Sequence, residues 1–470
     1  MHADELAFAG LARQAELVAS REVSPRELVD ACLERIEELD PRLNAFRVVF
    51  AERARAEAQQ AEGRLGAGGA EDRPLLGVPV AIKDDVDVAG EVTACGSRAH
   101  GPARTHDAEV VSRLRAAGAI VIGKTNVPEL TIFPFTESDA FGLTRNPWNR
   151  DRTPGGSSGG TAAAVAAGMV GAGLGSDGGG SIRIPAACCG LFGLKPQRGR
   201  ISLAPKRDGW HGLSVTGPLT RGVRDAALFL DVTAGPATGD IERAEPPRGS
   251  FVQAASTPPG ELRLAFSSKV PPGLIAKVGE DQKRALSETA ELLGSLGHRV
   301  VWESPDYGMA SLGFIARYLR GIHDDAHSMT HFEALEHRTR GMARMGAMIS
   351  PRMLARARRA EAVHAARINR IFDHVDVVVT PALATSPPPV GRWKGKGAFV
   401  TFNGVARFVP FQAVWNHIGQ PAATVPVGVG SDGMPLSVQL LGRPNDETTL
   451  LSLAAQMEAE RPWADRRPPL

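Results

Sequence analysis

The chain has 470 residues, of which 43% are hydrophobic and 23% are charged, so it can bury a large core in one large domain or in two to three ordinary ones. Its 54 basic and 52 acidic residues leave a net charge of +2, which argues against the concentrated basic surface of a nucleic-acid-binding protein. No apolar run reaches the roughly 18 residues that span a bilayer, and the acidic start at residues 1–5 lacks a signal-peptide pattern. We therefore expect a soluble protein that contacts neither nucleic acid nor membrane.

The four cysteines are Cys32, Cys95, Cys188 and Cys189. They show no CxxC or Cys/His spacing that would indicate zinc. Adjacent Cys188 and Cys189 rarely form a disulfide with each other, for geometric reasons. Reduced thiols in a cytoplasmic protein are the simplest interpretation.

Residues 24–39 predict an amphipathic helix. Ser24 and Glu27 have the spacing of a capping box, and Pro25 suits the first helical position. The apolar positions then follow a helical period. They are Leu28, Cys32, Leu33, Ile36 and Leu39.

The next segments indicate alternating helices and strands. A short apolar run at 76–82 (LGVPVAI) ends at Lys83. Asp107 is expected to cap a helix that Gly118 ends, and a strand at 119–122 follows directly. A helix followed at once by a strand is typical of α/β packing.

The middle of the chain combines loops with regular elements. Residues 144–160 predict a loop because Pro and Gly interrupt regular structure there, and a helix at 161–167 and a strand at 169–174 follow. Residues 235–260 are expected to form a surface connection. Residues 310–372 predict basic helices.

The C-terminal part repeats the α/β pattern. Strands are expected at 375–379, 423–427 and 436–441, and a helix at about 446–459. The side chains of this helix that we expect to face the core are Leu450, Leu453, Ala454 and Met457.

Two glycine-rich loops stand out, at 155–160 (GGSSGG) and at 175–181 (GSDGGGS). Consecutive glycines allow successive backbone N–H groups to point toward one negative oxygen. A serine at the end of such a loop, here Ser181, can attack a carbonyl carbon whose developing oxyanion the N–H groups bind. For one such loop alone, a tight turn between packed elements would be the better explanation.

Other motifs match parts of these loops. Residues 156–160 match the GxSxG pattern of α/β hydrolases with Ser158 at the centre, but that pattern needs a preceding strand, and here a proline-containing loop precedes it. GxGxxG occurs at 173–178 and again at 428–433, without the helix and acidic residue of a dinucleotide site. No Walker lysine is present, so the phosphate-loop interpretations fail.

His323, His327 and His331 are spaced by four residues and would share one face of a helix. Such a face can hold a metal ion. A solvated helix face is the commoner explanation, and we expect no metal site here.

Lys83 can act as a base only if its pKa is lowered, because an exposed lysine has a pKa near 10.4. The apolar run before it suggests burial, which disfavours the charged form. A neutral lysine can accept a proton from a serine. The alternative is a salt bridge between Lys83 and Asp84 or Asp85 at a strand end.

These segments together resemble the amidase signature family. The resemblance covers nearly the whole chain, and the order and spacing of the motifs are specific. The matching segments are GVPVAIKD at 77–84, GKTNVPEL at 123–130, RNPW at 145–148, GGSSGG at 155–160, GSDGGGSIRIP at 175–185, GLFGLKPQRG at 190–199 and DGMPLSVQLLGRP at 432–444.

The resemblance implies a role for each site residue. It implies that Ser181 is the nucleophile, that Lys83 is the base, and that Ser157 bridges them from a cis peptide bond. Gly178, Gly179 and Gly180, with Ser181, would supply the N–H groups of an oxyanion hole. The residues that we expect to support the site without reacting are Ser158, Asp177 and Arg183.

The family's fold is a single α/β/α domain with a large mixed β-sheet flanked by helices. The resemblance therefore implies one domain over residues 1–470, with an N-terminal helical segment at 1–65 and a variable helical substrate region at about 300–375. It implies no cofactor and no metal.

The implied activity is hydrolysis of a carboxylic amide to a carboxylate and ammonia or an amine. An alternative is an amidotransferase subunit that acts on glutamine with partner chains. Those members carry a tyrosine- and glycine-rich stretch near their substrate pocket, whereas this chain has only two tyrosines, Tyr307 and Tyr318. A second alternative is an esterase that uses Ser158. A non-catalytic binding protein is a third, and the intact set of Lys83, Ser157 and Ser181 argues against it.

The substrate is expected to be a small amide with an apolar acyl group. In the family the segment after NVPEL lines the entrance to the nucleophile, and here it contains Thr131, Ile132 and Phe133. Free glutamine should be a poor substrate, because its charges would be costly to bury among apolar groups. We expect the chain to act alone or as a homodimer. Further apolar candidates for the pocket are Phe314, Met329 and Trp415.

Overall fold

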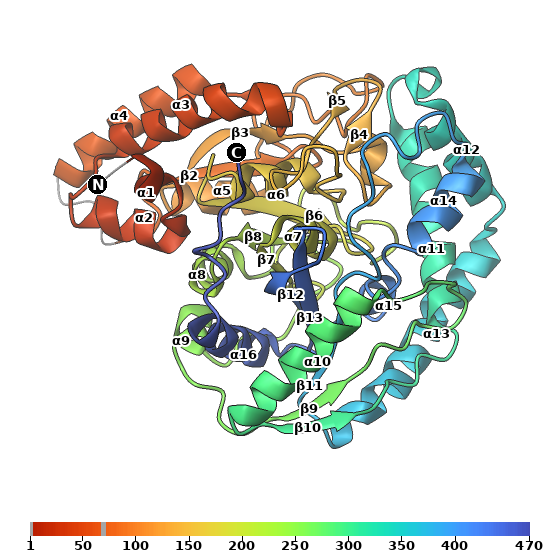
Figure 1. Cartoon of the computed structure of the whole chain (residues 1–470). Helices are drawn as coiled ribbons and strands as arrows, with labels where there is room; N and C mark the ends of the chain where they lie inside the picture. The colour runs from red at the N-terminus through yellow and green to blue at the C-terminus, as the bar shows by residue number, and fades with distance from the viewer. Residues whose placement is uncertain (1–2, 67–71) are drawn as a thin grey trace.

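An eleven-stranded mixed β-sheet runs through the molecule (Figure 1) in this computed structural model, which describes residues 3–66 and 72–470. The strand order is β1-β3-β2-β6-β8-β7-β12-β13-β11-β9-β10, and β4 and β5 form a separate two-stranded sheet. The strands are β1 (Phe46–Val49), β2 (Pro79–Lys83), β3 (Ile120–Thr125), β4 (Glu137–Ser138), β5 (Gly142–Leu143), β6 (Ala172–Asp177), β7 (Phe192–Lys195), β8 (Val215–Thr220), β9 (Arg263–Phe266), β10 (Arg299–Trp302), β11 (Val377–Pro381), β12 (Ala422–Val429) and β13 (Pro435–Leu441).

The strand directions make the sheet mixed. β2 is parallel to both β3 and β6, and β9 is parallel to both β10 and β11. The strands between these two parallel groups, from β8 through β7, β12 and β13, pair antiparallel. The predicted single α/β domain with a large mixed sheet is confirmed.

Helices cover both faces of this sheet. One face carries α2 (Gly10–Ala19), α5 (Glu109–Ala116), α8 (Val223–Thr233), α9 (Phe251–Ala255), α10 (Glu280–Ser295) and α16 (Glu447–Glu460). The other carries chiefly α3 (Pro25–Leu43), α4 (Ala51–Gly66), α6 (Gly159–Ala166) and α7 (Arg183–Cys189). The short α1 (Ala3–Ala7) precedes them, and α1–α4 lie together at the upper left of Figure 1.

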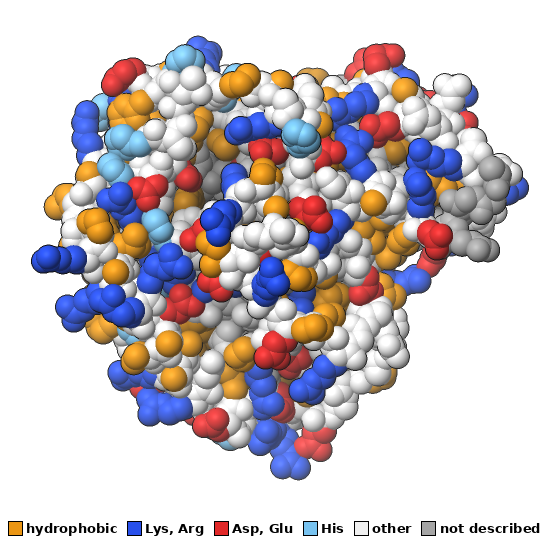
Figure 2. All heavy atoms as spheres, turned by 180° about the vertical axis from the view of Figure 1, so that it is seen from behind, with side chains coloured by type: hydrophobic (Ala, Val, Ile, Leu, Met, Phe, Trp, Pro, Cys, Tyr) orange, Lys and Arg blue, Asp and Glu red, His pale blue; other side chains and the backbone are white. Residues whose placement is uncertain are grey.

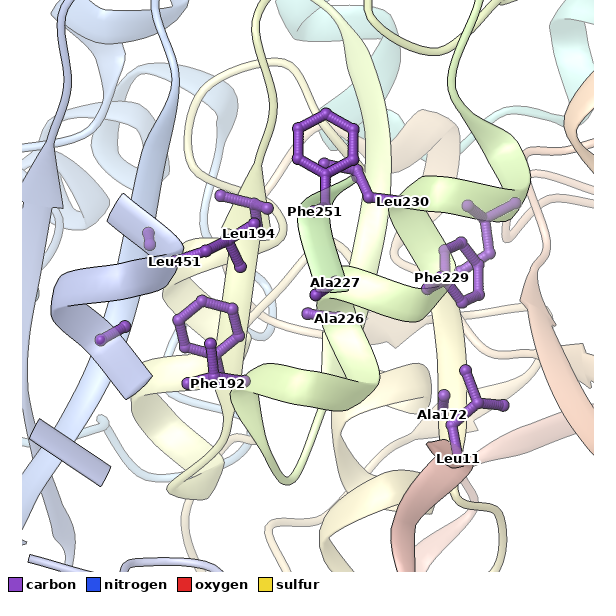
Figure 3. Close-up of a cluster of buried hydrophobic side chains, with 14 of the residues drawn as sticks. Leu11, Ala172, Phe192, Leu194, Ala226, Ala227, Phe229, Leu230, Phe251 and Leu451 are labelled. Atoms are coloured by element: carbon purple, nitrogen blue, oxygen red, sulfur yellow. The ribbon is translucent and has the colours of Figure 1, made fainter. Parts of the chain in front are cut away.

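The alternation of side chains along a strand decides which face each residue meets. In β2, Val80 and Ile82 join the core on the α8 and α16 face, whereas Ala81 joins the core with α6 and α7. Lys83 is two residues after Ala81 and therefore points to the α6 and α7 side. Figure 3 shows part of the first core, where Phe192 of β7, Ala226 of α8 and their neighbours pack together.

A further group of helices lies at the right of Figure 1. It has a core of its own, which includes Phe314 and Tyr318 of α11 and Phe135 from the segment after β3. The helices of this group are α11 (Ala310–Ser328), α12 (His337–Ala347), α13 (Pro351–Asn369), α14 (Ala398–Ala406) and α15 (Ala413–His417).

The prediction for the N-terminal helix is confirmed. Ser24 is the N-cap of α3 and its Oγ accepts a hydrogen bond from the Glu27 N–H at 3.2 Å, while the Glu27 carboxylate accepts one from the Ser24 N–H at 2.8 Å. The helix continues past residue 39 to Leu43 and ends at Asn44, whose φ of 52° lies in the left-handed region. Residues 1–2 of the predicted N-terminal segment lie outside the described residues.

Two local predictions need correction. Asp107 does not cap α5, because the N-cap of this helix is Ala108. The Asp107 carboxylate instead accepts a hydrogen bond from the Ala89 N–H at 2.7 Å and forms an ion pair with Arg115 at 3.1 Å. The strand predicted at 169–174 begins three residues later, as β6, because a turn with Gly168 at φ 69° separates it from α6.

Two features of the outside of the molecule bear on its partners. On the face shown in Figure 2, basic and acidic side chains are interspersed, so no broad area of one sign covers the described part of this face. No helix within residues 3–66 and 72–470 is long and apolar enough to cross a membrane.

Truncation of a core leucine tests the packing of α16 against the sheet. Leu453 is fully buried, so Leu453→Ala should lower the free energy of unfolding by about 2–5 kcal/mol. Leu312→Ala is the control, because Leu312 is 51% exposed and its truncation should change stability by less than about 0.5 kcal/mol. Urea unfolding followed by circular dichroism measures both. Equal effects for the two variants would contradict this account of the core.

Candidate functional site

Three segments far apart in the sequence converge at one end of β2 and β6. Lys83 is the last residue of β2, and Ser157 lies in the loop just before α6. Ser181 lies between β6 and α7. Because β2 and β6 are neighbouring parallel strands, their C-terminal ends meet at the same edge. The Gly156–Ser157 peptide bond is cis, as the family resemblance implied.

The Lys83 side chain is fully buried and its Nζ is surrounded by oxygen atoms. It donates to Ser157 Oγ at 2.8 Å, to Ser176 Oγ at 2.6 Å and to the Ser176 carbonyl at 3.3 Å. Asp85 Oδ2 lies 3.5 Å from the same nitrogen and accepts a hydrogen bond from Ser176 Oγ at 2.5 Å. The Lys83 amine thus has short contacts to two hydroxyl groups and a longer one to a carboxylate.

Burial and charge act in opposite directions on Lys83. Burial lowers the pKa of Lys83, and the nearby Asp85 and Asp177 carboxylates only partly offset this effect, so the pKa lies below its ordinary value. For Asp85, burial would raise the pKa, but the charges of Lys83 and Lys206 outweigh it and hold the pKa below its usual value.

The neighbouring carboxylate, Asp84, has other partners. It forms ion pairs with Lys124 at 2.8 Å and with Arg47 at 2.7 Å. The salt bridge that the sequence left open as an alternative for Lys83 therefore exists with Asp85 alone among the described residues, and it is longer than the bonds to the hydroxyl groups.

Ser158 is buried and holds two segments together. Its Oγ donates to the Ser176 carbonyl at 3.2 Å, and its N–H donates to the Ser181 carbonyl at 3.3 Å. It is the N-cap of α6 and follows a loop instead of a strand. This environment suits a structural link between β6 and the Ser181 loop and does not suit a GxSxG nucleophile.

The glycine loop offers fewer free N–H groups than the sequence suggested. The Gly180 N–H donates to Asp177 Oδ1 at 2.6 Å, so it is engaged within the chain. Within the described part of the chain, the N–H groups of Gly178, Gly179 and Ser181 have no hydrogen-bond acceptor. Gly180 also has φ 122°, and an added Cβ would lie 2.6 Å from Ile184, so only glycine suits this position.

The Asp177 carboxylate is the centre of a buried network. It accepts from Arg183 Nε at 3.0 Å, from the Ile182 N–H at 3.2 Å and from Asn416 Nδ2 at 2.8 Å. Arg183 also donates to Gln439 Oε1 at 2.7 Å. Burial would raise the pKa of Asp177, but the Arg183 guanidinium outweighs it and holds the pKa well below its usual range.

Two cavities meet at Ser181. One has a volume of about 310 Å³ and is lined by many polar groups, among them Asp85, Ser157, Ser176 and Lys206. We call it the polar cavity. The other, the apolar cavity, has a volume of about 240 Å³. The residues of the apolar cavity that matter here are Ile132, Ile184, Phe314, Tyr318, Phe402 and Val405.

The predicted substrate segment is divided between these cavities. Thr131 lines the polar cavity and Ile132 lines the apolar cavity. Phe133 lines neither; its ring stacks on Phe135 at 5.2 Å and packs under the Arg338 guanidinium. Phe133 belongs to the core of the α11 helix group, and its part in substrate binding stays a prediction.

The other proposed pocket residues also differ in their places. Phe314 lines the apolar cavity and Met329 lines the polar cavity. Trp415 lines neither, because it is fully buried and packs edge-on against Phe372. Sequence reasoning missed Trp210, which lines both cavities, since no local motif marks it.

Asp85 is one of the two carboxylates that the sequence left open as a salt-bridge partner of Lys83. Ser176 was missed as a member of the Lys83 environment, because no sequence pattern assigns a hydroxyl group one residue before Asp177 to Lys83. Asn416 and Gln439 were missed because they come from α15 and β13, far along the chain from Asp177.

The three histidines do not share one helix. α11 ends at Ser328, so His331 lies beyond it. His327 Nδ1 lies 2.8 Å from the His323 carbonyl, and His323 Nδ1 lies 3.1 Å from the Ala343 carbonyl. Among the residues that the structure describes, no group of three or more His, Cys, Asp or Glu side chains is arranged to hold a metal ion.

Comparison with known proteins identifies close relatives. The sequence profile described as Amidase matches residues 27–451. A protein of Mycobacterium tuberculosis named "Putative amidase AmiB2" is 56% identical over 469 residues, which cover 100% of this chain and 99% of that protein. The structure of 6-aminohexanoate cyclic dimer hydrolase complexed with substrate matches with a TM-score of 0.91 and 32% identity, covering 98% of this chain and 99% of that one. A bacterial aryl acylamidase of the amidase signature enzymes matches with a TM-score of 0.86 and 26% identity, covering 97% of each chain.

Loss of the buried arginine should destabilise the whole protein. Arg183→Met leaves the Asp177 carboxylate buried without its counter-charge, and we expect the free energy of unfolding to fall by about 3–5 kcal/mol. Arg284→Met is the control: Arg284 is half exposed, and the loss of its ion pairs with Asp281 and Glu288 should cost about 0–1 kcal/mol. Urea unfolding measures both variants. A loss below about 1 kcal/mol for Arg183→Met would refute the importance of this pair.

Proposed function

The chain belongs to the amidase signature family and is a hydrolase of carbon–nitrogen bonds in amides, and we propose that it works through an acyl-enzyme on Ser181, with Lys83 as the base and Ser157 as the proton carrier between them. The observation that carries this proposal is the 2.8 Å contact between Lys83 Nζ and Ser157 Oγ in a buried setting. Ser157 and Ser181 line the same polar cavity, which supports a proton path between them.

The first half of the reaction forms the acyl-enzyme. Neutral Lys83 takes the proton of Ser157 while Ser157 takes the proton of Ser181, and Ser181 Oγ attacks the amide carbon. The carbonyl oxygen becomes an oxyanion, for which the free N–H groups of Gly178, Gly179 and Ser181 are the donors. The carbon–nitrogen bond then breaks, Ser157 gives a proton to the departing nitrogen, and Lys83 returns its proton to Ser157.

The second half releases the acid. A water molecule takes the place of the departed amine, passes a proton to Ser157 and Lys83, and attacks the acyl carbon. The ester bond to Ser181 breaks, Ser181 regains a proton, and the carboxylic acid leaves. Lys83 ends the cycle neutral, so one water is consumed for each amide hydrolysed.

The surroundings of Lys83 support its proposed role in both protonation states. When Lys83 is charged, its three N–H bonds have three acceptors, Ser157 Oγ, Ser176 Oγ and the Ser176 carbonyl. Asp85 adds a negative charge at 3.5 Å. Burial favours the neutral form that starts the reaction.

The proposed reaction needs only a small amide, water and the chain itself, alone or as a homodimer, with no metal and no cofactor. Assays of the isolated chain also distinguish it from an amidotransferase subunit, which would need partner chains. We infer that the protein works in the cytoplasm. The four cysteines are unpaired in the structure, which agrees with a reducing environment.

Replacement of the nucleophile tests the proposal directly. We expect Ser181→Ala to lower kcat for a small amide by on the order of 10⁶-fold, as loss of a serine nucleophile does. A fluorophosphonate should label Ser181 alone, as seen by mass spectrometry of the digested protein. Ser158→Ala is the matched control, which should keep the label on Ser181. Labelling of Ser158 in the unmodified chain would replace this proposal with a GxSxG mechanism.

Substitution of the base separates proton transfer from charge. Lys83→Arg keeps the positive charge but cannot release a proton in a protein. We expect kcat/KM to fall on the order of 10²–10⁴-fold for both Lys83→Arg and Lys83→Ala, the usual contribution of a general base. Substantial activity in the arginine variant would show that Lys83 acts only through its charge.

The acid limb of the pH profile should report the protonation of Lys83. Because only the neutral amine accepts a proton, kcat/KM should fall as the pH falls through the lowered pKa of Lys83. Asp85 raises that pKa, so Asp85→Asn should move the acid limb to lower pH. Stopped-time assays of one amide across pH measure the shift. An unmoved or oppositely moved limb would show that this limb belongs to another group.

A further inference from the structure

The two cavities at Ser181 differ in chemistry and share two of their lining residues. Ser181 and Trp210 line both of them. The polar cavity contains charged groups such as Lys206 and Asp325, whereas apolar side chains such as Phe314 and Phe402 dominate the other. An amide bound at Ser181 has two sides, an acyl group and an amine, and each side can enter one cavity.

Several contacts hold Trp210, which lines both cavities, in place. Its Nε1–H donates to Asp325 Oδ2 at 2.7 Å, and its ring meets the Tyr318 ring edge-on at 5.1 Å. The ring also packs closely on two glycines: a Cβ added at Gly178 or at Gly321 would lie 2.7 Å from it. The wall between the cavities is therefore fixed by contacts on several sides.

The place of the proton donor determines which side of the substrate enters which cavity. Ser157 lines the polar cavity and is not part of the apolar one. In the proposed mechanism Ser157 protonates the departing nitrogen, so the amine must lie on the side of Ser157. The acyl group then extends from Ser181 into the apolar cavity. The N–H groups of Gly178 and Gly179 stand at the junction, since one glycine lines each cavity.

We infer that the enzyme hydrolyses secondary amides in which an apolar acid of medium length is joined to a hydrophilic amine, with the acid in the apolar cavity and the amine in the polar cavity. This assignment rests on the proposed function, because it uses Ser157 as the proton donor. It extends that function by giving each half of the substrate its own chemical class and its own place.

The charged groups of the polar cavity favour a hydrophilic amine. Lys206 Nζ donates to the Asp85 carbonyl at 3.2 Å and, within the described residues, has no carboxylate within 4.0 Å. Asp325 accepts the Trp210 N–H and has no cation within the same distance among those residues. Both groups are exposed and can therefore bind hydroxyl or charged groups of an amine, for which an alkyl amine offers no partner.

The apolar cavity favours a chain of methylene groups. Each methylene that leaves water for an apolar site favours binding by about fourfold, until the cavity is filled. Phe402 contributes to this surface from α14 and stacks on Tyr318 at 6.0 Å. A polar group in this cavity would lose its hydrogen bonds to water without replacement.

Two isomeric amides test the orientation. N-(2-hydroxyethyl)hexanamide has the apolar acid and the hydrophilic amine, and N-hexyl-2-hydroxyacetamide has the same atoms with the two sides exchanged. We expect kcat/KM for the first isomer to exceed that for the second by at least about tenfold. Burial of about two methylene groups is enough to produce a difference of this size. The electron-withdrawing hydroxyl group next to the carbonyl makes the second isomer intrinsically more reactive. Intrinsic reactivity therefore cannot explain a preference for the first isomer.

Variants of α14 test the apolar cavity itself. Along a series of N-(2-hydroxyethyl) amides from acetyl to hexanoyl, kcat/KM should rise about fourfold per methylene. Phe402→Asn should flatten this rise. Phe399→Asn is the matched control, because Phe399 lies on the same helix, is 70% exposed and lines neither cavity, and it should keep the rise.

The outcomes separate this inference from the proposed function. Three results would overturn the orientation: equal kcat/KM for the two isomers, a preference for the exchanged isomer, or an unchanged rise of kcat/KM with acyl length in Phe402→Asn. Hydrolysis that still depends on Ser181 would leave the proposed function intact. If the unmodified chain hydrolyses an amide with no loss on Ser181→Ala, the proposed function fails and the orientation fails with it.

Discussion

The buried ion pair between Asp177 and Arg183 holds the parts of the site in one arrangement. Asp177 ends β6 and Arg183 begins α7, so the pair closes the loop that carries Ser181. Asn416 and Gln439 complete the hydrogen bonds of the pair from α15 and β13. A buried charge without partners is costly, so this loop has little freedom to change its conformation. The position of Ser181 thus depends on residues that line neither cavity.

Lys83 illustrates a balance between two opposing effects. Complete burial favours the neutral amine, and Asp85 at 3.5 Å favours the ammonium. Ser176 lies between these groups, because its hydroxyl accepts from Lys83 and donates to Asp85. A group whose two protonation states are both accommodated can accept and return a proton within one catalytic cycle, which is the task of a general base.

The walls around Ser181 connect the fold to the choice of substrate. The polar cavity lies beside the ends of β2 and β6, where Lys83 donates hydrogen bonds to Ser157 and Ser176. The apolar cavity is built instead from α11 and α14, in the helix group at the right of Figure 1. A change in these helices can alter the apolar cavity without moving Lys83, Ser157 or Ser176.

The sequence by itself determined the features that depend on neighbouring residues or on motifs in a specific order. The capping box of Ser24 and Glu27 is local, and the segments around Lys83, Ser157 and Ser181 identified the family. Tertiary structure alone decided the places of Phe133, Trp210 and Trp415. An aromatic residue in the sequence is compatible with a position in a core and with a position in a cavity wall, and only the packing of distant helices decides between the two. The hydrogen bond from Gly180 to Asp177 is also beyond sequence, since it depends on the exact backbone dihedral angles of the loop.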